Sequence, residues 1–180
     1  MRKQGLWFRL VDKRLDESME KRKESNMGIV KAVCISEKKG TQKKDVKVAK
    51  FIENYGIEND AHAGKWHRQV SLLSYDRVEE FRQRGANVDD GAFGENLLVE
   101  GMDFKTYPIG TVFQCNDVIL ELTQVGKKCH SECEIFYQVG DCIMPREGVF
   151  TVVVQGGTIQ VGDQLEVIKL GDGTTDKINK

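Results

Sequence analysis

Short runs of apolar residues, separated by glycines and by charged turns, recur along most of this chain. Runs of this length, either alternating or continuous, are typical of β-strands rather than of helices, which need longer periodic stretches. The predicted strands cover residues 29–35, 46–48, 70–73, 97–99, 112–115, 118–122, 149–154 and 164–168.

Turn residues join two pairs of these strands. The pair Asn116-Asp117 predicts a hairpin between the two strands that flank it. The pair Gly156-Gly157 predicts that the last two strands form a further hairpin.

Helical spacing is confined to a small part of the chain. Val78 and Phe81 recur at this spacing after Ser74, which can cap a helix that Gly85 would end. The two expected helices cover residues 75–84 and 131–139.

Many short strands with few helices predict a mainly β fold: a closed or partly open β-barrel with one or two short helices. The sequence lacks the strand–helix alternation of a nucleotide-binding sheet and the glycine-rich motifs that bind phosphate there. Closing the sheet leaves few exposed edges, so we expect the functional residues in loops at one mouth of the barrel.

We expect one domain over residues 27–170, with a peripheral or flexible extension over 1–26 and a frayed polar tail over 171–180. Two interpretations of the extension stay open: a docking helix for a partner or membrane surface, and a segment upstream of a natural start at Met27. The apolar residues that recur there at helical spacing are Trp7, Val11, Leu15 and Met19.

Composition excludes several classes of protein. The formal net charge is −1 at pH 7, so the chain lacks the basic field that nucleic acid requires. No apolar run reaches the roughly 18 residues of a transmembrane helix, and no secretory signal opens the chain, so we expect a cytoplasmic protein. In that reducing compartment the cysteines are expected to be thiols, with Cys34 and Cys115 as small buried residues within strands.

The densest group of reactive side chains follows the strand at 118–122. The adjacent lysines favour the thiolate of Cys129, and protonation of His130 strengthens this effect. We therefore expect Cys129 to be a reactive thiol in a loop at a strand end. The whole group comprises Lys127, Lys128, Cys129, His130 and Cys133, with Cys142 further along the chain.

Two other segments carry candidate chemistry. In the loop 59–68, Lys65, Arg68 and backbone N–H groups can hold an anion, although a solvated loop is the alternative interpretation. In the glycine-rich segment 91–97, a buried Glu95 or Asn96 must either bond to backbone groups or face a site, because burial without a partner is costly.

These groups stand in an order that resembles the MOSC domain, the module at the C-terminus of molybdenum-cofactor sulfurases. The resemblance runs from about Met27 to Ile168 and includes a full G-x-F-G-E-N-L pattern. The matching segments are 60–64 with Arg68, 91–97, 109–110, 118–129, 148–150, 156–159 and 162–163.

The resemblance implies a β-barrel-like fold and a role in molybdenum-cofactor sulfur chemistry. Cys129 would hold sulfur or ligate molybdenum as a soft thiolate, in a carrier of cofactor or sulfur or in a reductase of N-hydroxylated compounds. The implied partner is a molybdenum enzyme or a sulfur-donating desulfurase, and no pyridoxal phosphate site is expected here. The candidates for holding the phosphate-bearing pterin (molybdopterin) are His62, Lys65, Arg68, Glu95, Asn96, Lys127 and Lys128.

Two positions depart from the usual family pattern, with Asn59 in place of glycine and Lys128 in place of a proline before the cysteine. A different class of function also stays open, because four residues could form a small zinc or thiol-redox site. Their spacing lacks the paired C-x-x-C pattern of common structural zinc sites. The four residues are Cys129, His130, Cys133 and Cys142.

Overall fold

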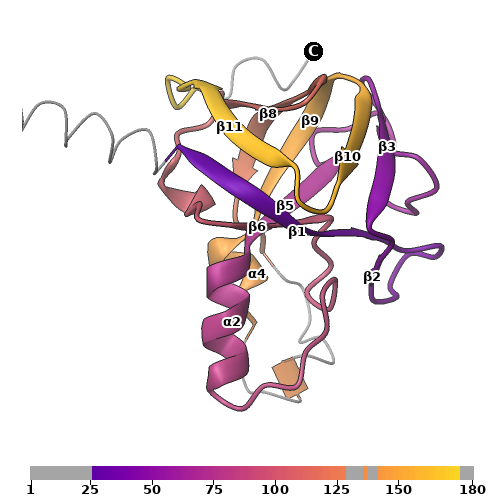
Figure 1. Ribbon diagram of the computed structural model, residues 1–180, viewed down its shortest axis with the longest axis vertical. Coiled ribbons are helices and arrows are strands. Elements are labelled where there is room, and N and C mark those ends of the chain that lie inside the picture. The colour runs from indigo at the N-terminus through magenta and orange to yellow at the C-terminus, as the bar shows by residue number, and fades with distance from the viewer. Residues whose placement is uncertain (1–25, 129–135, 138–141, 175–180) are drawn as a thin grey trace, which may run out of the picture.

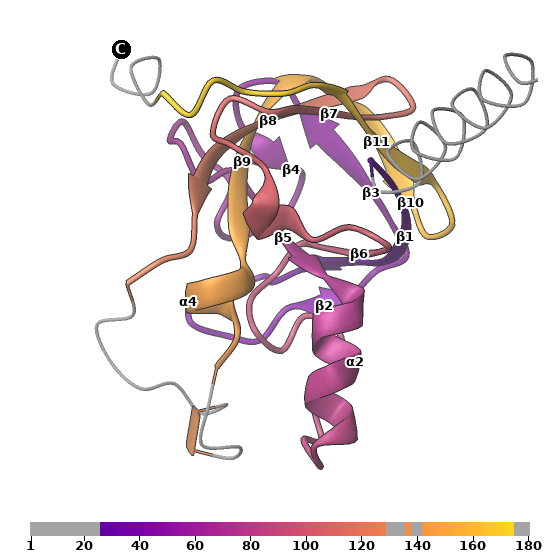
Figure 2. The same ribbon diagram turned by 90° about the vertical axis from the view of Figure 1, so that its left-hand side faces the viewer.

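The computed structural model describes residues 26–128, 136–137 and 142–174. Seven strands form a closed barrel in the order β11-β7-β8-β9-β5-β6-β1, and β1 pairs back onto β11 (Figures 1 and 2). The β5–β6 pair is parallel and the other pairs are antiparallel, so the predicted mainly β barrel is confirmed. The barrel strands are β1 (Met27–Ile35), β5 (Val70–Ser74), β6 (Leu97–Glu100), β7 (Val112–Cys115), β8 (Val118–Val125), β9 (Val149–Gln155) and β11 (Gln164–Lys169).

Apolar side chains fill the barrel interior, and β1 shows how the pattern is achieved. Its register against β6 shifts between Val30 and Ala32, which is the signature of a β-bulge. The shift brings Val30 and Val33 into the interior core, whereas Ala32 and Cys34 belong to a second apolar cluster. One strand therefore contributes to two cores.

The second cluster joins α2 (Tyr75–Gln83) to the barrel. Val78 and Phe81 of this helix are buried, and the Phe81 ring meets the Phe93 ring edge-to-face at 5.3 Å between centroids. Met144 of α4 (Met144–Glu147) belongs to the same cluster. This core therefore holds α2, α4 and the glycine-rich segment 91–97 against one end of the barrel (Figure 1).

Most of the local predictions agree with the structure, but the strand expected over 46–48 is wrong. Lys47 has a φ of 67°, which interrupts extended backbone, and the next strand begins only at Val48. Gly85, at a φ of 97°, follows the end of α2, and Asn116, at a φ of 52°, lies in the β7–β8 hairpin. Ser74 occupies the N-cap position of α2, but its side chain makes no capping hydrogen bond, so that detail was wrong. The helix expected over 131–139 lies largely outside the described residues, as does the extension over 1–26.

The hairpin predicted across Gly156-Gly157 is wrong. β9 continues into β10 (Gly157–Gln160), which pairs with β3 (Val48–Ile52) in a separate sheet that also holds β4 (Gly56–Ile57). β11 instead pairs with β7 and β1, because closing the barrel requires its last strand to meet its first. The remaining short elements are β2 (Lys44–Asp45), which pairs with β1, and the 3-10 helix η1 (Phe104–Thr106).

In the part of the chain that the structure describes, no helix is both long and apolar enough to cross a bilayer.

Asn59 adopts a backbone conformation that favours glycine. Its φ is 64°, in the left-handed region that asparagine tolerates better than most other residues with a side chain. The departure from the glycine usual at this position therefore keeps the backbone geometry.

A buried carboxyl supports the glycine-rich segment. Oε1 of the fully buried Glu95 accepts a hydrogen bond from the Gly91 N–H at 2.7 Å, and Oε2 has no partner among the described residues. A Cβ on Gly91 would lie 2.3 Å from the Lys43 carbonyl oxygen, so only glycine allows this approach. Burial raises the pKa of Glu95 to about 7.

We expect Asn59→Ala to lower the free energy of unfolding by about 1 kcal/mol, because alanine tolerates positive φ poorly. Asn59→Gly should stay within about 0.5 kcal/mol of wild type. Urea denaturation measures both, with Asn87→Ala in an exposed loop as the control. Wild-type stability in Asn59→Ala would contradict the backbone explanation.

We expect wild-type stability to fall, relative to Glu95→Gln, as the pH rises from about 4.5 to about 7. Between these pH values the Glu95 carboxyl keeps its proton in the folded protein and loses it in the unfolded chain. Raising the pH therefore lowers the free energy of unfolding, by on the order of 3 kcal/mol at most. Urea denaturation at pH 5 and pH 8 measures the difference. Equal pH dependence in the two proteins would refute this assignment.

Candidate functional site

A cavity of about 290 Å³ lies where β8 ends and where β6 and β9 begin. It is formed by the loop after β1, the loop before β5, the start of β9 and the residue that precedes β6. Four of the residues that the sequence singled out line this cavity: His62, Arg68, Asn96 and Lys127. The lining residues with polar or aromatic side chains include Lys43, His62, Arg68, Asn96, Lys127 and Phe150.

A buried ion pair lies beside this cavity, and its lysine, Lys43, lines the cavity wall. Lys43 Nζ contacts the two carboxylate oxygens of Asp60 at 2.7 and 2.8 Å, and the two side chains are 2% and 0% exposed. Asp60 also accepts hydrogen bonds from the Ser36 N–H at 3.0 Å and from Asn96 Nδ2 at 3.2 Å. Burial by itself would raise the pKa of Asp60, but these hydrogen bonds outweigh it and hold the pKa below its usual value.

His62 lines the cavity beside this pair. Its Nδ1 lies 3.4 Å from Ser36 Oγ. Burial, followed by the nearby charge of Lys43, lowers the pKa of His62 below its usual value. The imidazole is therefore neutral at pH 7 and can contribute hydrogen bonds rather than charge.

Two cations on the cavity wall have no carboxylate partner among the residues that the structure describes. Arg68 packs its guanidinium 5.5 Å from the Phe150 ring centroid and 5.9 Å from the Trp66 ring centroid. Lys127 is half-buried and is the second residue after β8. Within the described residues neither side chain forms an ion pair, so no described carboxylate neutralises either charge.

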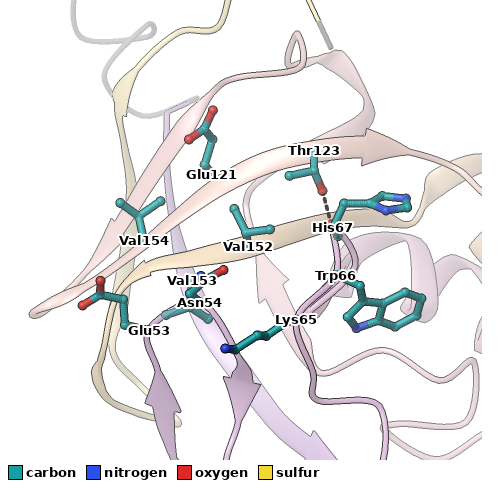
Figure 3. A pocket seen from close by; sticks show the side chains of 10 residues that line it. All are labelled: Glu53, Asn54, Lys65, Trp66, His67, Glu121, Thr123, Val152, Val153 and Val154. Carbon is teal, nitrogen blue, oxygen red and sulfur yellow. Dashed lines mark hydrogen bonds between the residues drawn. The ribbon is translucent and has the colours of Figure 1, made fainter. Parts of the chain in front are cut away.

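Lys65, which we expected beside Arg68, lines a different and larger cavity of about 590 Å³. Figure 3 shows its side chain extending toward Glu53 and Asn54, away from the Trp66 and His67 rings. The loop therefore divides its cations between two cavities. Spacing along the sequence could not reveal that division.

Asn96 and Glu95 differ in their relation to the site. Asn96 lines the first cavity, but its amide is engaged by protein groups: Nδ2 donates to the Cys34 carbonyl at 2.9 Å and Oδ1 accepts from the Ser71 N–H at 3.1 Å. Glu95 lines neither cavity. Both residues therefore support the loops that shape the site.

Only one residue of the predicted cysteine and histidine group, Cys142, lies among the described residues. Cys129, His130 and Cys133 lie outside the described residues, so the zinc alternative stays a prediction. Cys142 is 8% exposed and packs in the second core. Cys34 and Cys115 are fully buried, as expected, and burial raises the pKa of Cys115 to about 12.

Lys43 and Trp66 line the cavity although the sequence pattern gave them no role. Lys43 lies in a lysine-rich stretch that is typical of a solvated loop, and nothing local distinguishes it from Lys44. Only its distant partner Asp60 gives it a role. Trp66 lines both cavities although 43% of its surface is exposed, and an aromatic residue in a charged loop was the available signal.

Residues 59–166 match the family model of the MOSC domain. The uncharacterized protein YflK of Bacillus subtilis (strain 168) is 25% identical over 146 residues, which cover 74% of this chain and 65% of YflK. This chain thus spans slightly less than two thirds of that relative's length.

Solved structures share the fold. The YuaD protein from Bacillus subtilis has a TM-score of 0.65 at 18% identity, covering 78% of this chain and 95% of YuaD. YiiM from Geobacillus stearothermophilus has a TM-score of 0.60 at 18% identity, covering 82% of this chain and 77% of YiiM. With more than half of its length matched by the family model, this chain belongs to the MOSC domain family.

Proposed function

We propose that this protein binds the molybdenum cofactor in the cavity of about 290 Å³, with the cofactor's phosphate against Arg68 and Lys127. The observation that carries the proposal is the presence of two cations on the cavity wall with no carboxylate partner among the described residues. Arginine suits this role because its planar guanidinium can donate two parallel hydrogen bonds to one phosphate.

The size and lining of the cavity fit part of such a ligand. Its volume stands at the lower end of the range for small-molecule sites, which suits a phosphate and the adjoining atoms rather than a whole pterin. Lys43 Nζ has three N–H donors and Asp60 takes two of them, which leaves one for the cavity. The neutral His62 adds a hydrogen-bonding group without further charge.

Cys129 is the residue that we propose for contact with molybdenum or with a transferable sulfur. Lys127 lines the cavity and only two peptide units separate it from Cys129, so their Cα atoms are at most about 7 Å apart. The adjacent Lys127 and Lys128 favour the thiolate. The bound cofactor would supply a thiophilic metal centre, for which a soft thiolate is the matching protein ligand.

A separate protein completes this scheme. In the proposal, a desulfurase that carries a cysteine persulfide transfers its outer sulfur to the Cys129 thiolate, and the desulfurase cysteine leaves as a thiolate. Cys129 then holds that sulfur as a persulfide for a molybdenum enzyme. As a carrier of cofactor, the Cys129 thiolate would instead hold the molybdenum of the whole cofactor until that enzyme takes it. The same site could also reduce N-hydroxylated compounds. A reductase activity of the protein loaded with cofactor would indicate a catalyst, and its absence would indicate a carrier.

We expect Cys129→Ala, purified from cells that make the cofactor, to stay folded and to retain about tenfold less molybdenum or transferable sulfur than wild type. Metal analysis, pterin fluorescence and sulfide release measure the retained groups. The matched control is Cys115→Ala, which removes a buried thiol in the β7–β8 hairpin. Equal retention in the two variants would remove Cys129 from its proposed role.

We expect Arg68→Ala to lower the retained pterin about tenfold, because it removes a charge-assisted contact to phosphate. Alkylation of Cys129 by iodoacetamide should proceed at the wild-type rate, since Arg68 acts on the anion and not on the thiol. Arg84→Ala, at an exposed position after α2, controls for the loss of one arginine. Wild-type retention in Arg68→Ala would count against phosphate binding in this cavity.

A further inference from the structure

His67 lies between two residues that make opposite demands on one ring nitrogen. Its Nε2 is 3.2 Å from Arg68 Nε and 3.0 Å from Gln124 Oε1. Arginine can only donate at Nε, and an amide oxygen can only accept. The ring nitrogen has a single in-plane position, which carries either a lone pair or a hydrogen.

The two hydrogen bonds therefore exclude one another. With a lone pair on Nε2, His67 accepts from Arg68; with a hydrogen there, it donates to Gln124 and leaves the Arg68 Nε–H facing another N–H. Rotating the Gln124 amide, which would turn its N–H donors toward His67, does not resolve this, because Gln124 Nε2 donates to the Gly126 carbonyl at 2.6 Å. A rotated amide would bring two oxygens together at that position.

The surroundings hold the His67 backbone and ring in this place. Thr123 Oγ1 donates to the His67 carbonyl, the contact dashed in Figure 3. The Trp66 ring meets the His67 ring edge-to-face at 6.2 Å between centroids. His67 is thus fixed between the large cavity that it lines and the arginine of the smaller one.

We propose that His67 is a positioning residue for Arg68. A lone pair on His67 Nε2 anchors the Arg68 Nε–H and leaves both terminal nitrogens of the guanidinium for an anion. When Nε2 carries a hydrogen instead, it donates to Gln124 Oε1, and the hydrogen bond from the Arg68 Nε–H is lost. This proposal rests on the proposed anion site at Arg68 and adds how the arginine is held there.

The test uses the full chain and inorganic phosphate as the probe. Calorimetric titration gives the dissociation constant, and ¹⁵N NMR follows the exchange of the Arg68 Nε–H and the protonation of His67 Nε2. We expect His67→Phe, which keeps a ring without a lone pair, to weaken phosphate binding about fivefold and to speed Nε–H exchange. His67→Gln should restore both values to within about twofold, since its amide oxygen can accept from Arg68.

Phosphate should also slow Nε–H exchange in the wild-type protein and shift His67 toward the form with a lone pair on Nε2. Thermal unfolding of each variant checks that the barrel is intact. The positioning role is overturned if His67→Phe binds phosphate and protects the Nε–H as wild type does while Arg68→Ala loses binding. If Arg68→Ala binds phosphate like wild type, the proposed anion site itself fails, which is a different outcome.

Discussion

The ion pair between Lys43 and Asp60 is the interaction on which the cavity depends. Lys43 comes from the loop after β1 and Asp60 from the loop before β5. The same carboxylate also accepts hydrogen bonds from Ser36, in the loop after β1, and from Asn96, before β6, so one buried charge joins three segments of the chain. Removing one partner of such a pair costs about 3–5 kcal/mol, because the other charge is left buried and uncompensated. The pair fixes the relative position of the loops more than it adds to net stability.

This arrangement also decides the charge that the cavity offers. Asp60 is fully engaged by Lys43 and the neighbouring donors, so it does not neutralise Arg68 or Lys127. Burial and Lys43 keep His62 neutral. The result is a local positive field in a chain whose net charge is close to zero.

The barrel supplies the rigidity that this site needs. Pairing of β1 with β11 closes the sheet, and the β-bulge in β1 lets one strand serve two cores. The second core holds α2, α4 and the segment 91–97 beside the cavity. Side chains on the loop 59–68 can then face two cavities while the backbone that carries them stays fixed.

The sequence by itself determined the seven strands of the barrel, the β7–β8 hairpin and the first helix, because each depends on residues close together in the chain. It also carried the family pattern. It also singled out Asn59, whose left-handed backbone is a local property. Only the tertiary structure decided that Lys43 is buried, that β10 pairs with β3, and that Lys65 and Arg68 face different cavities. These features depend on partners far away in the sequence, and spacing along the chain carries no information about such contacts.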